Sequence, residues 1–337
     1  MGSNEKNRRR MTKARLARKR KQRNRMLALM LTAIFILLVI LLLVNRKKAR
    51  ENDEKQGRQS GDVVVLEDAK DEKSTAEAEP EIRTVTFTEE QMHAGDLILV
   101  SSRYPYDFAA NENTMELTSI REAQSFYYQL EKEDFQVAGR IMPALDEIVA
   151  ACDAAVGTKQ TGIASAYRSL EYQQSVWDEI AELNGQEYAE NFVAAPGYSE
   201  HHTGLAVDMS IFYEDGSEGS FSESENAVWM NDNAYLYGFI RRYAENKVEI
   251  TGISNEAWHF RYVGIPHATY MSANDLCLEE YIDYLRAETS AASPLTVNCD
   301  DGTYDIFFTA ESTIEEPQGD YTVSGNNVDG YIITIRK

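Results

Sequence analysis

Residues 26–44 (MLALMLTAIFILLVILLLV) form an unbroken apolar run that contains no charged side chain and a single Thr. A helix of these 19 residues would be roughly 28 Å long at 1.5 Å per residue, which is enough to cross the hydrocarbon core of a bilayer. A buried core helix of a soluble domain would show a polar stripe, but this run is apolar on every side. We therefore predict a transmembrane helix over residues 26–44.

Basic residues flank this predicted helix unevenly. Twelve Lys or Arg precede it, whereas only four follow it closely. The positive-inside rule predicts that residues 1–25 remain in the cytoplasm and that the chain after the helix lies outside the cell. A cleavable signal peptide would end at a small-residue site, and residues 44–48 (VNRKK) offer none. The helix is therefore expected to stay in place as a single-pass anchor in the cell membrane.

The charge of the chain is also divided unevenly. Residues 1–50 hold 16 Lys or Arg and one acidic residue, whereas residues 51–337 hold 18 Lys or Arg and 54 Asp or Glu. An acidic domain repels phosphate backbones, so nucleic acid is not expected as a partner. Residues 45–84 are mostly charged or small and cannot bury a core, which predicts an extracellular stalk without fixed structure. These patterns identify no protein partner.

Helical spacing is clear in two stretches of the part that follows, residues 85–337. Apolar residues from Ile141 to Val156 fall on one face of a helix that Gly157 would end. Ser169 is suited to cap a second helix. The predicted buried face of that second helix includes Val176, Ile180 and Leu183.

Strand patterns complete the predicted domain. Residues 205–211 and 258–262 alternate between apolar and polar side chains, as half-buried strands do. Asp301-Gly302 predicts a hairpin inside a C-terminal β segment, residues 291–337. The fold class is therefore α+β, with a small antiparallel sheet and helices packed on it.

Residues suited to zinc gather in two short segments, SEHHTGLAVD at residues 199–208 and EAWH at residues 256–259. Strand alternation allows Asp208 and His259 to face the same cleft. A catalytic zinc site uses three protein ligands and leaves a fourth position for water, and two imidazoles with one carboxylate satisfy that count. Glu256 would remain free to move a proton, as peptide hydrolysis requires.

Both segments match the pattern SxHxxGxAxD followed by ExWH, and the chain thereby resembles the zinc D-alanyl-D-alanine carboxypeptidases of the VanY type. The resemblance continues through SAYRSLEYQ (165–173), NAYLYGFIRRY (233–243) and ITGISNEAWHFRYVG (250–264). It implies a hedgehog/DD-peptidase-like fold over residues 85–337 and one bound zinc ion.

The resemblance also implies a role for each residue that matches the pattern. Of the two adjacent histidines, only His201 has the spacing to Asp208 that the pattern requires, so His202 is not expected to bind the metal. The implied metal ligands are His201, Asp208 and His259. The implied catalytic and substrate-binding residues are Glu256 as general base, Arg168 as stabiliser of the oxyanion, and Gln173 and Ser199 as residues that help to hold the substrate.

We therefore predict a membrane-anchored enzyme that removes the C-terminal D-alanine from peptidoglycan stem peptides outside the cell, by attack of a metal-bound water. Three alternatives remain open. An LD-carboxypeptidase of the same family would act on the tetrapeptide, a non-catalytic wall-binding module would lack the general base, and an endopeptidase would need an open groove on both sides of the zinc.

The three cysteines do not match any zinc-ligand spacing. Cys152 lies on the apolar face of its predicted helix and is expected to be a buried hydrophobe. Cys277 and Cys299 can either pair or remain free, because sequence alone does not fix disulfide connectivity.

The predicted orientation can be tested on wall-stripped cells whose protein carries an N-terminal tag. The basic N-terminal segment opposes transfer across the membrane, whereas an acidic domain can be translocated. Protease added outside should therefore remove the chain beyond about residue 50 and spare the tag. A digested tag together with a protected C-terminal domain would overturn both the orientation and the extracellular substrate.

Overall fold

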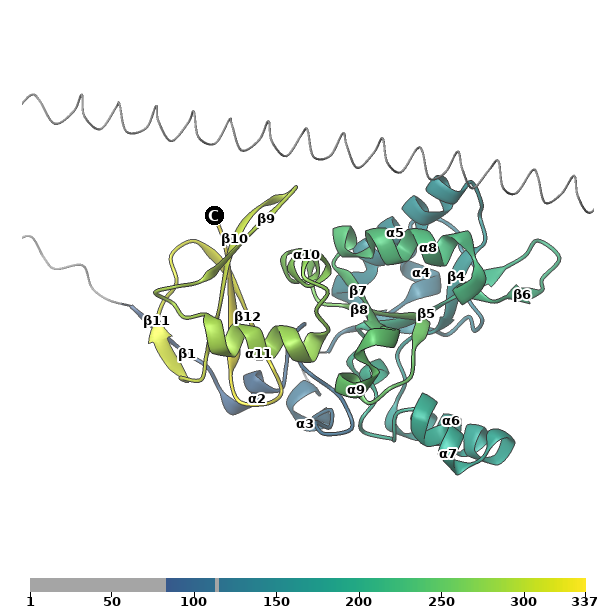
Figure 1. Ribbon diagram of the computed structural model, residues 1–337, viewed down its shortest axis with the longest axis horizontal. Coiled ribbons are helices and arrows are strands. Elements are labelled where there is room, and N and C mark those ends of the chain that lie inside the picture. Colours follow the sequence, from purple (N-terminus) through teal and green to yellow (C-terminus); the bar gives the residue numbers. More distant parts are fainter. Residues whose placement is uncertain (1–82, 113–114) are drawn as a thin grey trace, which may run out of the picture. The chain divides into compact units, whose positions relative to one another are not determined.

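The computed structural model describes residues 83–112 and 115–337 (Figure 1). The predicted cytoplasmic segment, the transmembrane helix and nearly all of the stalk lie outside these residues. Among the helices that are described, none is long and apolar enough to cross a bilayer.

A five-stranded antiparallel sheet, which we call the central sheet, organises the first part of the described chain. Four strands run in the order β4-β5-β8-β7, and the short strand β6 pairs with β5. The bounds are β4 (Thr161–Ser165), β5 (Ala206–Phe212), β6 (Glu218–Gly219), β7 (Phe239–Tyr243) and β8 (Glu256–Tyr262).

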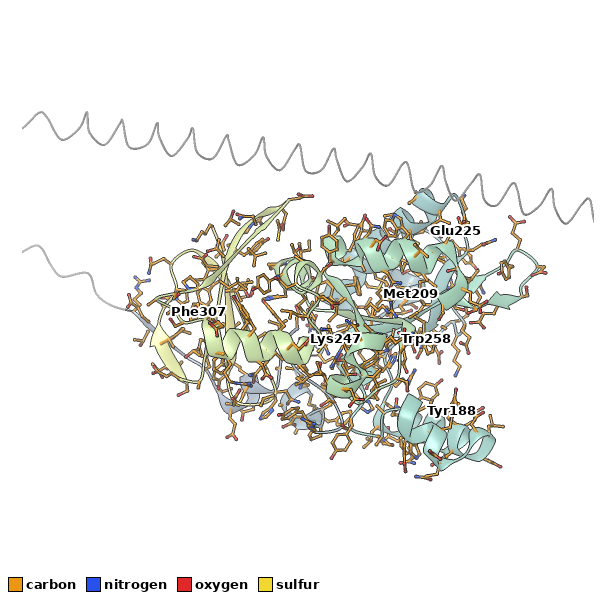
Figure 2. The ribbon with its side chains drawn as sticks, in the orientation of Figure 1. Tyr188, Met209, Glu225, Lys247, Trp258 and Phe307 are labelled. Carbon is orange, nitrogen blue, oxygen red and sulfur yellow. The ribbon has the colours of Figure 1, made fainter. Side chains whose placement is uncertain are left out.

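One face of the central sheet forms the main core. Val207, Met209 and Phe260 belong to this core. Helices α5 (Met142–Val156) and α8 (Glu225–Asn233) lie over this face of the sheet (Figure 1), and Met209 is labelled beneath them in Figure 2. The alternation predicted for both strands is confirmed, since Asp208 and His259 lie on the opposite face. Helix α5 ends at Gly157 as predicted, in a left-handed conformation with φ of 79° that glycine adopts without strain.

Helix α6 (Leu170–Asn184) begins as predicted but does not bury the predicted face. The Ser169 hydroxyl caps it by accepting a hydrogen bond from the backbone N–H of Tyr172. Val176 and Ile180 are only half-buried, and Leu183 is 70% exposed. The prediction for Leu183 is wrong because α6 packs through its first turns, while its C-terminal half continues into α7 (Gln186–Phe192) away from the sheet (Figure 1).

A second antiparallel sheet forms most of the C-terminal lobe, which we define as residues 266–337. Its strand order is β12-β13-β10-β9, and the predicted hairpin at Asp301-Gly302 joins β9 to β10. Helix α11 (Leu278–Glu288) packs Ile282 and Leu285 against this sheet. The described residues thus form two larger sheets, where we predicted one small sheet. The strand bounds are β9 (Leu295–Cys299), β10 (Gly302–Thr309), β12 (Asp320–Gly325) and β13 (Tyr331–Arg336).

The remaining described elements are short. Two strand pairs, β1 with β11 and β2 with β3, are antiparallel. Their bounds are β1 (Thr84–Thr86), β11 (Thr313–Glu315), β2 (Leu117–Ser119) and β3 (Gln136–Ala138). The α-helices are α2 (Glu89–Met92), α3 (Phe108–Asn111), α4 (Ile120–Ala123), α9 (Val248–Thr251) and α10 (Ile265–Ala273). The 3-10 turns are η1 (Gly139–Ile141), η2 (Glu200–Thr203), η3 (Phe221–Glu223), η4 (Ala234–Tyr237) and η5 (Glu245–Lys247).

All three cysteines of the chain are free. Cys152 is buried in α5, as predicted. Cys277 precedes the first turn of α11, and the Cys299 thiol lies 3.7 Å from the hydroxyl of Thr269. Cys277 and Cys299 are therefore unpaired, which is one of the two possibilities that the sequence left open.

His267 of α10 gives the fold a measurable dependence on pH. Its imidazole is 6% exposed and uses both nitrogens, with Nδ1 2.8 Å from the Tyr281 hydroxyl and Nε2 3.2 Å from that of Thr334. Burial lowers the pKa of His267 to about 3. Because the unfolded chain binds this proton at a pH near 6.5, stability should fall as the pH drops from about 6.5 toward 3.

We expect His267→Gln to remove this dependence. Below about pH 6, the free energy of unfolding of the wild-type chain, measured in urea, should fall more steeply than that of the variant. The difference should reach up to about 1.4 kcal/mol for each pH unit. A difference between the two proteins that stays constant from pH 7 to about 4 would contradict a neutral, buried His267.

Candidate metal centre

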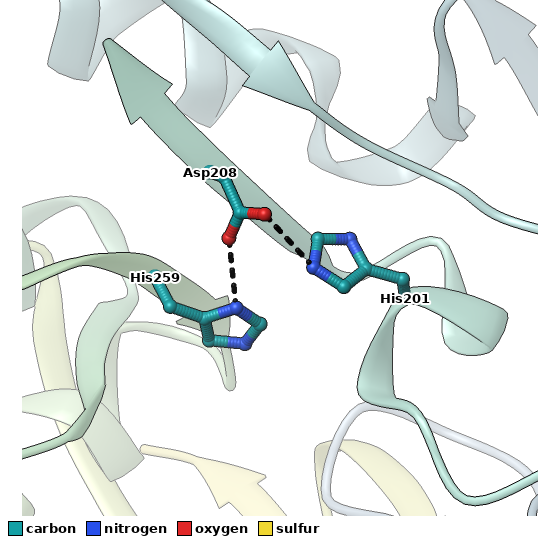
Figure 3. Close-up of side chains that lie close together, drawn as sticks. All are labelled: His201, Asp208 and His259. Atoms are coloured by element: carbon teal, nitrogen blue, oxygen red, sulfur yellow. Dashed lines mark hydrogen bonds and ion pairs between the residues drawn. The ribbon is translucent and has the colours of Figure 1, made fainter. Parts of the chain in front are cut away.

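Three elements bring one side chain each to a common point on the face of the central sheet opposite the main core. β5 supplies Asp208, β8 supplies His259, and the turn η2 supplies His201 (Figure 3). The register of the sheet places Asp208 directly opposite His259. All three side chains are buried, and their ligand atoms lie within 4.8 Å of one another.

Each imidazole turns one nitrogen toward Asp208. Nε2 of His201 is 3.3 Å from Oδ2, and Nδ1 of His259 is 2.9 Å from Oδ1 (Figure 3). On the far side of the ring, Nδ1 of His201 lies 2.7 Å from the Ala166 carbonyl oxygen, to which it can only donate. His201 therefore presents a lone pair at Nε2, which is the form that binds a metal.

The donor chemistry of these three side chains fits zinc. Two imidazole nitrogens and one carboxylate oxygen are a common set of protein ligands in catalytic zinc sites. Burial, followed by the nearby positive charge of Arg168, lowers the pKa of His201 to about 4 and keeps the ring neutral. Although burial alone would raise it, the pKa of Asp208 lies well below its usual range, because the carboxylate accepts a hydrogen bond from the protonated ring of His259.

His259 has the opposite protonation preference. Burial opposes its charge, but hydrogen bonds to Asp208 and Glu200 raise the pKa of His259 to about 9. A metal ion that binds Nδ1 must therefore displace a proton near neutral pH. Tyr243 packs over the ring, with centroids 4.8 Å apart, and limits its rotation.

Glu256 lies beside the three donors. Its Oε2 is 3.8 Å from Nδ1 of His259, and its side chain is buried. Burial raises the pKa of Glu256 to about 7. A carboxyl group with a pKa close to neutrality can both accept and return a proton, as a general base must.

Arg168 reaches the same point from the start of α6. Its Nη2 lies 3.1 Å from Oδ2 of Asp208, its Nη1 donates to Oε1 of Gln173 at 3.1 Å, and its Nε donates to the Ser165 hydroxyl at 3.0 Å. The guanidinium is thus held in place by three side chains.

Gln173 and Ser199 both lie near the three donors but make different contacts. Gln173 is fully buried, and its amide is occupied by Arg168 on one side and by the Ala194 carbonyl on the other, at 2.7 Å. This geometry favours a role in orienting Arg168 over direct contact with substrate. The Ser199 hydroxyl caps η2 by accepting from the N–H of His201, and Ser199 also lines the cavity described next.

A cavity of about 180 Å³ lies over the three donors. Val176 and Ile180 of α6 line it together with Trp258. A neighbouring cavity of about 450 Å³ shares Arg168, Asp208, Val176 and Trp258 with the first. Trp258, which also packs against the main core, is therefore part of the site.

Glu200 is a site residue that the sequence did not reveal. Its carboxylate is buried, and Oε2 lies 3.4 Å from Nε2 of His259. Oε1 accepts hydrogen bonds from Arg242 at 2.8 Å and from Arg261 at 2.9 Å. Arg261 could have indicated such a residue in the sequence, because Arg261 shares a strand face with His259 and a buried arginine needs an anionic partner.

His202 points away from the three donors. Residues 200–203 form the 3-10 turn η2, which Ser199 caps and Gly204 ends with φ of 67°. Nδ1 of His202 lies 2.7 Å from the Arg168 carbonyl oxygen, and Nε2 accepts from the N–H of Gly197 at 3.0 Å. Both nitrogens of His202 are thus occupied by backbone groups.

Comparison with known proteins gives consistent relatives. Residues 134–265 match the family model described as VanY, D-alanyl-D-alanine carboxypeptidase. A D-alanyl-D-alanine carboxypeptidase of Enterococcus faecium is 35% identical over 255 residues, which are 74% of this chain and 78% of that protein.

Solved structures resemble the chain as well. The vancomycin resistance D,D-dipeptidase VanXYg, in complex with a D-Ala-D-Ala phosphinate analogue, is 30% identical and matches 76% of this chain and 99% of its own, with a TM-score of 0.66. A variant of the vancomycin resistance D,D-pentapeptidase VanY, in complex with Zn(II), is 36% identical over 56% of this chain and 98% of its own, with a TM-score of 0.44.

The different environments of the adjacent histidines predict different consequences of their loss. His201→Ala should abolish binding of stoichiometric zinc, because it removes one of three donors. His202→Ala should leave zinc bound and lower activity, because it releases the backbone at Arg168. Metal analysis of both purified variants tests this, and loss of zinc only in His202→Ala would show that the wrong imidazole was chosen.

Proposed function

The chain belongs to the VanY family of D-alanyl-D-alanine carboxypeptidases, and on this premise we propose that it removes the C-terminal D-alanine from peptidoglycan stem peptides. The observation that carries the proposal is the placement of Glu256 and Arg168 beside the three buried donors, where all five side chains line one cavity. Such a set contains the groups that hydrolysis of a peptide bond requires.

The cofactor is zinc, which His201, Asp208 and His259 would hold. Zinc, when bound, supplies a Lewis acid that lowers the pKa of a water and polarises the scissile carbonyl. The chain provides the remaining chemistry. The proposed ligands are held by Ala166 behind His201 and by Glu200 behind His259, so their orientation is fixed before substrate arrives.

Glu256 would move the proton. Its carboxylate can take a proton from the attacking water and return it to the nitrogen of the departing D-alanine. The pKa of about 7 supports both halves of this transfer near neutral pH. Oε2 of Glu256 lies 3.8 Å from Nδ1 of His259, which is close to the proposed metal position. The three other donors can hold the metal without Glu256.

Arg168 would stabilise the negative charge that develops on the carbonyl oxygen. The guanidinium is already oriented by Ser165, Gln173 and Asp208, so little reorganisation is needed as the charge forms. Fixed donors of this kind contribute most when water is excluded, and the Arg168 side chain is only 14% exposed.

An LD-carboxypeptidase would use the same groups on a tetrapeptide. Parallel assays of a pentapeptide ending in D-Ala-D-Ala and of the corresponding tetrapeptide separate the two activities, and we expect the pentapeptide to be hydrolysed faster. A non-catalytic wall-binding module is disfavoured by the presence of Glu256 together with all three donors. We further propose that the reaction takes place outside the cell, on a domain anchored through residues 26–44, as the charge pattern supports.

Glu256→Gln should abolish turnover and leave zinc bound, because it removes the proton carrier while keeping the three donors. His259→Ala should lose both activity and zinc. Hydrolysis of a D-Ala-D-Ala peptide, measured beside the zinc content, tests the two roles. A Glu256→Gln enzyme that retains more than about one hundredth of the wild-type kcat would contradict the proposed general base.

A further inference from the structure

Four charged side chains form an ionic cluster behind His259, three of them buried and the fourth partly exposed. They are Glu200, Arg242, Arg261 and Glu279. Arg242 and Arg261 are among the largest fully buried side chains of the described residues. Glu200 lies at the centre of this cluster, where it accepts from both arginines and contacts Nε2 of His259.

The fourth member of the cluster comes from the C-terminal lobe. Glu279 lies in the first turn of α11 and accepts two hydrogen bonds from Arg242, from Nη1 at 2.9 Å and from Nη2 at 2.6 Å. This residue lies beyond residues 134–265, the part that matches the family model. A segment outside the matched region therefore holds one of the two groups that orient Glu200.

The geometry gives Glu200 control over the orientation of His259. Asp208 faces Nδ1 of the ring and Glu200 faces Nε2, so the two carboxylates together determine which nitrogen points to the metal position. Glu200 can serve in this way only while its own carboxylate is fixed, and Arg242 and Arg261 fix it through Oε1.

The charges of the cluster also balance. Two carboxylates and two guanidinium groups give a formal charge of zero next to the proposed metal position. Loss of the Glu279 charge would leave one excess positive charge. Because buried charges are weakly screened, this excess positive charge would oppose the binding of a divalent cation. Arg242, without its Glu279 partner, would also shift from its present geometry.

We propose that Glu279 is a positioning residue of the zinc centre, through which the C-terminal lobe acts on His259 by way of Arg242 and Glu200. The inference rests on the proposed function, because it takes His259 as a zinc ligand. The competing explanation is that Arg242 and Glu279 only fasten α11 to the rest of the domain. In that case their loss would lower stability and leave zinc affinity unchanged.

The experiment measures zinc affinity by chelator competition on the full chain in detergent, with thermal unfolding of the zinc-free protein alongside. Glu200→Gln should weaken zinc binding about 10- to 100-fold, as is usual for a group that orients a metal ligand. Glu279→Gln should weaken it by at least about threefold, since it acts through two intermediates. Gln keeps the size of the side chain and removes only its charge.

Glu280→Gln is the matched control. Glu280 is the next residue of α11, is paired with Lys247 at 2.8 Å, and accepts from the backbone N–H of Cys277. Its loss should lower the stability of α11 and leave zinc affinity unchanged. Equal zinc affinities for the Glu279→Gln and wild-type proteins would overturn the proposal, whatever happens to their stability.

A double variant shows whether the effect travels through Glu200. In the Glu200→Gln background, Glu279→Gln should have little further effect on zinc affinity, whereas two independent effects would multiply. Multiplied effects would overturn the proposed route. His259→Ala separates a failure of the proposed zinc site from a failure of the positioning role. If that variant still binds zinc, the assignment of His259 as a ligand fails. If it does not, the result for Glu279→Gln decides on the positioning role alone.

Discussion

The antiparallel pairing of β5 with β8 is the constraint on which the site depends. It places Asp208 opposite His259, with the core side chains Val207 and Phe260 on the other face. A shift of either strand by one residue would exchange these faces, so the packing of the main core also fixes the register of the metal donors. The position of His201 then follows from the capped turn that leads into β5.

The electrostatics of the site follow from the burial of many like charges. Asp208, Glu200 and Glu256 lie within contact distance of one imidazole, that of His259. Such a group of carboxylates needs positive charge nearby, and Arg168, Arg242 and Arg261 supply it from three separate elements. Glu256 has no arginine partner at hydrogen-bond distance among the described contacts, and it is this carboxyl whose pKa rises to about 7.

Local pattern predicted the parts of the structure that depend on local forces. The helix ended by Gly157, the cap at Ser169 and the alternation that separates Asp208 from the core all follow from neighbouring residues. The exposure of Leu183 and the role of Glu200 depend on contacts between distant segments. Glu200 meets Arg242 and Arg261 across separations of 42 and 61 residues, which a single sequence does not display.

The free thiols have a consequence for how the protein can be handled and where it can fold. Burial raises the pKa of Cys152 to about 11 and that of Cys277 to about 12, so both remain protonated at neutral pH and react slowly with oxidants. No crosslink contributes to the described fold. The domain should therefore reach the same structure under reducing and oxidising conditions, and its folding requires neither a disulfide-forming catalyst nor an oxidising compartment.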